Sequence, residues 1–187
     1  LQLLSQVDDP EVTQDLLEVT SRDDVPDQLR ETAAQALSTR DSGAAFLVDS
    51  LAVHHDFLSQ SRPVPLTIVS RTLTRMEATE AVPALLEHLM DHETPIEDLR
   101  EVAAAIVALG DETVVSPLRD FLVRYHRDSA FAENAEALTV IVDGLRQHGH
   151  QDELDLLQAM SENALTLASV REHIQMRVQE QIDADER

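Results

Sequence analysis

Histidines beside acidic residues are the side chains in this sequence best suited to metal chemistry. The chain has eight His, and Glu87-His88 lies close to His92-Glu93. On one continuous helix His88 and His92, four residues apart, would share a face as metal ligands often do. However, His92 falls where the helix expected over 79–91 should end. We therefore interpret this group as a polar, solvated helix terminus, where the helix dipole favours His.

Two further histidine clusters occupy matching places at the ends of predicted helices: His54-His55-Asp56 and Tyr125-His126-Arg127. A repeated helix end explains both, and metal or ligand binding there is the alternative. His148 and His150 flank Gly149 in a predicted turn and are expected to be exposed.

Residues for nucleophilic catalysis or phosphate binding are missing. The chain has no Cys and only four Gly, which are too scattered for a phosphate loop, and no G-x-S-x-G elbow. Carboxylate pairs such as Asp23-Asp24 and Asp152-Glu153 fall at predicted helix N-termini, where the dipole stabilises them. We expect no catalytic residue, no cofactor and no metal, and hence a protein that is not an enzyme.

The charge balance excludes further classes. The 36 Asp and Glu oppose 14 basic residues, all of them Arg, which gives a net charge of -22. Such a surface repels nucleic acid and anionic lipid. No apolar run is long enough for a membrane span, and no signal peptide is visible. The compartment is not determined, although the lack of Cys and of a signal peptide favours the cytoplasm.

Apolar residues recur at helical spacing along the whole chain, for example at Val82, Leu85, Leu86 and Leu89. No stretch alternates with a period of two, so an all-α fold is predicted. Thr94 and Glu97 have the spacing of a capping box. The predicted helices span about 1–7, 10–21, 26–39, 42–59, 64–77, 79–91, 95–109, 112–126, 131–148, 150–161 and 163–181.

An internal repeat relates two of these segments. Leu29-Arg30-Glu31 and Ala33-Ala34 match Leu99-Arg100-Glu101 and Ala103-Ala104 at an offset of about 70 residues. That period is too long for one helical hairpin but fits two.

The segment Ala81–Asp111 resembles a HEAT repeat. Its first helix holds Pro83 and Leu85-Leu86, an Asp follows at 91, Leu99-Arg100 opens a second helix, and Leu109-Gly110 closes it. The resemblance implies a right-handed α-solenoid of about five hairpins, roughly 9–40, 41–77, 78–110, 111–149 and 150–182. These would form a single repeat domain over 1–187, which we expect to be a piece of a longer chain.

The same resemblance implies that second helices line a concave face and that Asp91 and Arg100, with Arg30, form a ladder between hairpins. Positions opposite the core stripes of the second helices are then candidates for binding a partner. They are Gln28, Glu31, Gln35, Thr67, Arg71, Thr74, Glu97, Glu101, Ala105, Glu136, Thr139 and Asp143.

This acidic face predicts a non-catalytic protein–protein interaction scaffold whose partner is a basic or helical protein segment. Two alternatives stay open. One is a metal-dependent HEAT-like enzyme or metal binder that uses the His and Glu clusters, and the other is a structural spacer within a larger protein. The oligomeric state is not predicted.

Overall fold

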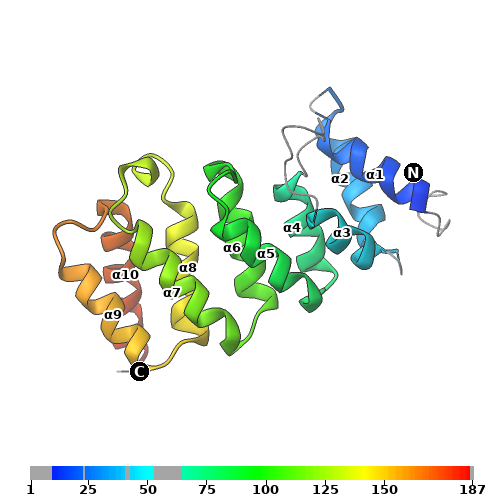
Figure 1. Ribbon diagram of the computed structural model, residues 1–187. Helices are drawn as coiled ribbons and strands as arrows, with labels where there is room; N and C mark the ends of the chain where they lie inside the picture. Colours follow the sequence, from blue (N-terminus) through cyan, green and yellow to red (C-terminus); the bar gives the residue numbers. More distant parts are fainter. Residues whose placement is uncertain (1–9, 23, 41–42, 53–64, 186–187) are drawn as a thin grey trace. The chain divides into compact units, whose positions relative to one another are not determined.

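The computed structural model describes residues 10–22, 24–40, 43–52 and 65–185 (Figure 1). Within them the chain forms ten α-helices and three short 3-10 helices, and no β-strand. The all-α prediction is therefore confirmed for the described part of the chain. The chain divides into two compact units, Leu1–Thr94 and Pro95–Arg187.

The first unit holds five α-helices: α1 (Pro10–Ser21), α2 (Asp27–Ser38), α3 (Gly43–Leu51), α4 (Leu66–Arg75) and α5 (Val82–Met90), with a 3-10 turn at Thr79–Ala81. Helix α1 packs on α2, α2 on α4, and α3 on α4 and α5. The apolar stripes point inward, so that Leu16, Ala33 and Leu37 form a buried cluster against which Val12 packs. Burial of these aliphatic side chains is what holds the hairpins together.

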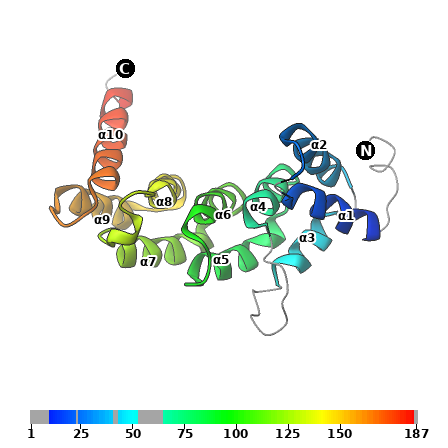
Figure 2. The ribbon, with the colours of Figure 1, turned by 90° about the horizontal axis from the view of Figure 1, so that it is seen from above.

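The second unit holds α6 (Ile96–Leu109), α7 (Val115–Tyr125), α8 (Glu136–His148), α9 (Gln151–Glu162) and α10 (Ala168–Asp185), with 3-10 turns at Glu112–Val114 and Ser129–Phe131. Helix α8 lies between α6 and α10 (Figure 2), and it contacts both of them as well as α7 and α9. Three aromatic rings close one end of the α7–α8 hairpin: the centroid of Phe121 lies 4.6 Å from that of Tyr125 and 6.1 Å from that of Phe131.

Close packing of α6 against α8 depends on Gly144. A Cβ atom added there would lie only 2.4 Å from Cγ2 of Val107 on α6. A glycine in the middle of a helix otherwise weakens it. Here the absent side chain is what allows the two helices to approach.

Several predicted helix starts are wrong, and side-chain hydrogen bonds explain why. The helix predicted from 131 begins at Glu136, because Oδ1 of Asp128 accepts from the N–H of Ala130 and sets a 3-10 turn first. The helix predicted from 163 begins at Ala168, because Oδ1 of Asn163 accepts from the N–H of Leu165. The helix predicted over 1–7 lies outside the described residues, as does the part of the helix predicted over 42–59 that follows residue 52.

The predicted capping box is also wrong. The N-cap of α6 is Pro95 rather than Thr94. The buried hydroxyl of Thr94 donates instead to the carbonyl oxygen of His88, at 2.8 Å. A capping box is found instead at the start of α9, where Oε2 of Glu153 accepts from the N–H of His150 at 2.9 Å.

Candidate interaction surface

Ion pairs link consecutive second helices within each unit. In the first unit, Nη2 of Arg75 on α4 lies 2.8 Å from Oε1 of Glu31 on α2. In the second, Nε of Arg100 on α6 lies 2.9 Å from Oε2 of Glu136 on α8, and Arg100 also pairs with Glu101. Arginine is suited to this role because its fork of donors can hold two carboxylates at once.

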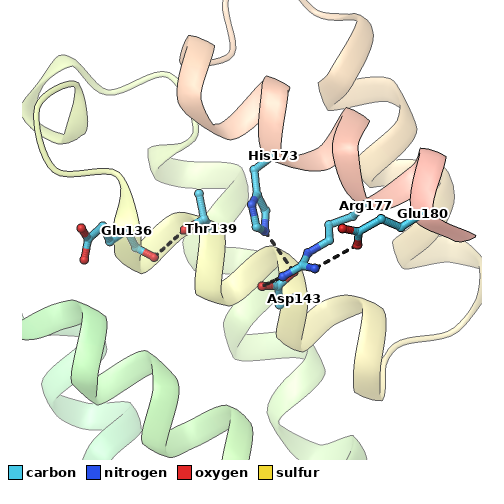
Figure 3. Close-up of polar contacts among 6 residues, drawn as sticks. All are labelled: Glu136, Thr139, Asp143, His173, Arg177 and Glu180. Carbon is cyan, nitrogen blue, oxygen red and sulfur yellow. Dashed lines mark hydrogen bonds and ion pairs between the residues drawn. The ribbon is translucent and has the colours of Figure 1, made fainter.

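The strongest of these links joins α8 to α10 (Figure 3). The carboxylate of Asp143 accepts hydrogen bonds from Nε and Nη2 of Arg177, at 2.9 and 3.0 Å. Nε2 of His173 lies 3.0 Å from Oδ1 of Asp143. Nη1 of Arg177 also donates to Glu180, at 2.9 Å. Arg177 thus contacts the carboxylates of both Asp143 and Glu180, and His173 contacts that of Asp143.

The electrostatics of Asp143 follow from this geometry. Partial burial raises the pKa of its carboxyl, but the hydrogen bonds from Arg177 and His173 together outweigh burial and hold that pKa below its usual value. The hydrogen bonds from Arg177 to Asp143 and to Glu180 raise the pKa of Arg177. Asp143 therefore stays ionised and serves to position α10.

First helices carry a link of their own. Nη1 of Arg119 on α7 lies 3.1 Å from Oε1 of the buried Glu153 on α9. The backbone N–H of His150 is the main reason that the pKa of Glu153 is lowered, and Arg119 adds to it. Glu153 therefore caps the start of α9 and joins two hairpins at the same time.

Four of the described histidines contact neighbouring segments through their rings, and for His88 and His148 the sequence interpretation needs correction. His88 is buried instead of solvated, and its Nε2 lies 2.7 Å from the carbonyl oxygen of Leu51 on α3. His148 is half-buried, with Nε2 at 2.8 Å from the carbonyl oxygen of Val107 on α6. His92 is exposed as expected, whereas His54-His55-Asp56 lies outside the described residues.

His126, the other histidine predicted at a helix end, caps α7. It is buried, with Nδ1 at 3.1 Å from Oγ1 of Thr166, and its carbonyl oxygen accepts from the N–H of Leu167. Burial, with a smaller effect of Arg127, lowers the pKa of His126. The described residues contain no group of three or more His, Asp or Glu that could hold a metal ion.

The predicted partner-binding residues are exposed to very different degrees. Gln28, Glu31, Gln35 and Arg71 are exposed in the first unit, where Thr74 is half-buried and donates to the carbonyl oxygen of Ser70. In the second unit Glu97 and Glu136 are exposed, whereas the side chain of Glu101 is only 12% exposed. Ala105 is wrong as a surface position, since it is buried.

The predicted acidic face is largely neutralised. Four of its carboxylates, those of Glu31, Glu101, Glu136 and Asp143, already pair with arginines. Arg75 and Arg177, which neutralise the first and the last, were missed because they lie 44 and 34 residues away from their partners. Among the carboxylates of this face, Glu97, in the first turn of α6, is exposed and forms no ion pair with the described residues.

None of the helices in the described ranges is both long enough and apolar enough to cross a membrane. Comparison of the chain with protein-family models, with curated proteins and with solved structures finds no match.

Proposed function

We propose that the chain is a HEAT-like, right-handed α-solenoid that serves as a non-catalytic scaffold for protein–protein interaction. The observation that carries this proposal is the linkage of consecutive second helices: α2 contacts α4, α6 contacts α8, and α8 contacts α10, each pair joined by an Arg–carboxylate contact. Stacked hairpins of this kind present one row of helices to a partner.

The polar composition of the second helices supports binding rather than catalysis. Their exposed residues include Gln28, Gln35 and Glu97, whose side chains can hydrogen-bond a partner. The partner proposed is a basic or helical protein segment, with Glu97 as the principal attractive charge.

Affinity capture with matched variants tests this function. The full chain, Glu97→Arg and Glu112→Arg would each be used as bait in a lysate of cells that encode the protein. Both positions are exposed carboxylates in the first turn of a helix, and both variants change the net charge equally. A protein retained by wild type and Glu112→Arg and lost by Glu97→Arg is the expected result. Identical capture by all three baits, or none above bare resin as a structural spacer would give, contradicts the proposal.

A further inference from the structure

Helix α7 and Arg127, which lies just after the end of the helix at Tyr125, present one exposed face. Asp120, Val123, Arg124 and Arg127 follow the spacing i, i+3, i+4, i+7, and all four are exposed. The opposite side of α7 holds the buried Leu118, Phe121 and Leu122. This face points away from the core of the second unit.

Two arginines on this face differ from the other arginines that the structure describes. Neither Arg124 nor Arg127 makes a side-chain hydrogen bond or an ion pair with any of the described residues. Arg75, Arg100, Arg119 and Arg177 all pair with carboxylates instead. In a chain with a net charge of -22, two neighbouring arginines without an acidic partner are unexpected.

Two exposed aliphatic side chains belong to the segments that meet at the end of α7. Val123 is 47% exposed, and Leu165, in the α9–α10 turn, is 67% exposed. That turn lies against the end of α7, because the N–H of Leu167 donates to the carbonyl oxygen of His126 at 2.8 Å and Thr166 contacts the His126 ring. Arginine is enriched at protein interfaces and in their hot spots, and exposed apolar side chains rimmed by polar residues can mark an interaction site.

From this arrangement we propose that the face formed by Val123, Arg124, Arg127 and Leu165 binds an acidic protein segment that carries aliphatic side chains. Charge complementarity selects the occupant: carboxylates pair with the two guanidiniums while an aliphatic side chain covers Val123 and Leu165. Asp120, at the far end of the face, sets its boundary by repelling further carboxylates. This surface goes beyond the proposed function, since it lies on a first helix and selects the opposite charge.

The test uses two fluorescent helical peptides, one with Glu and Leu at alternating helical positions and one with Gln replacing each Glu. Binding is measured by anisotropy at an ionic strength of about 0.15 M, where the Debye length of about 8 Å screens the distant acidic surface. The proteins are wild type, Arg124→Gln/Arg127→Gln, Val123→Ser, and the control Arg22→Gln, which removes an exposed arginine already paired with Asp24.

We expect the acidic peptide to bind wild type and Arg22→Gln alike, and to lose at least about tenfold in affinity on the double variant and several-fold on Val123→Ser. Equal binding of the Gln peptide would remove the role of charge. Unchanged affinity of the double variant, or no saturable binding by wild type at peptide concentrations up to about 1 mM, would overturn the proposal.

Discussion

Asp143 is the residue on which the contact between α8 and α10 depends most. It accepts three hydrogen bonds from two cationic or potentially cationic side chains, and it is only partly exposed. Charge-assisted hydrogen bonds contribute more than neutral ones, although partial exposure to solvent weakens them.

Replacing Asp143→Asn should lower the free energy of unfolding by about 1–2 kcal/mol, because Arg177 then loses one half of a bidentate ion pair. Urea unfolding followed by circular dichroism measures this. Asp120→Asn, which removes an exposed carboxylate without a described ion pair, should change the stability by less than about 0.5 kcal/mol. Equal losses in both variants would show that Asp143 acts only through the net charge.

The buried His126 predicts that the stability of the fold depends on pH. Its pKa is lowered in the folded state, mainly by burial, so the unfolded chain binds more protons as the pH falls below about 6.5. Stability should be fully present above that pH and should decrease towards pH 5. His126→Asn should lessen this dependence, whereas His92→Asn, at an exposed position, should retain it. Parallel pH profiles of wild type and His126→Asn would refute the assignment.

At the scale of helices, hydrophobic periodicity predicted which segments are helical and which faces are buried. The stripe that includes Val82, Leu85 and Leu89 is an example, since all three are buried. It did not predict the starts of α8 and α10, because the side chains of Asp128 and Asn163 divert the backbone into turns. Such local hydrogen bonds compete with helix formation and leave no periodic signal.

Gly144→Ala tests the close approach of α6 and α8. Alanine favours a helix over glycine by about 1 kcal/mol, but its Cβ would meet Cγ2 of Val107, a β-branched side chain with little rotamer freedom. Overpacking of this kind costs about 1–3 kcal/mol, so a net loss of stability is expected. The melting temperature should fall, and Val107→Ala in the same chain should restore part of it. A higher melting temperature for Gly144→Ala alone would show that the helices are farther apart.

Across the whole molecule, charge was easy to count and hard to place from sequence. The net charge of -22 predicted an acidic second-helix face, yet arginines distant in sequence neutralise Glu31, Glu136 and Asp143. Such pairs depend on how hairpins stack, and periodicity describes each helix only by itself. Exposed carboxylates such as Glu97 and Glu112 are therefore a better guide than the net charge to repulsion between charges and to the recognition of a partner.

Raising the salt concentration from low to about 1 M should stabilise the chain. Screening relieves repulsion among unpaired carboxylates, whereas the partly exposed ion pairs that it weakens each contribute only about 0–1 kcal/mol. Thermal unfolding across a NaCl series measures the effect. The triple variant Glu80→Gln/Glu97→Gln/Glu112→Gln, which neutralises three exposed carboxylates, should flatten this dependence on salt. A wild-type stability that falls with salt would mean that the ion pairs dominate.

Photo-crosslinking in the native cell tests most directly whether the second helices form a partner-binding row. A photoreactive amino acid would be placed in the full chain at Gln35 or Glu97, both exposed on second helices, or at Glu112 or Asp155, both exposed outside them. Discrete adducts with the same protein at Gln35 and Glu97, and none at Glu112 or Asp155, are the predicted result. Adducts of equal strength at all four positions, or none at Gln35 and Glu97, would contradict the scaffold function.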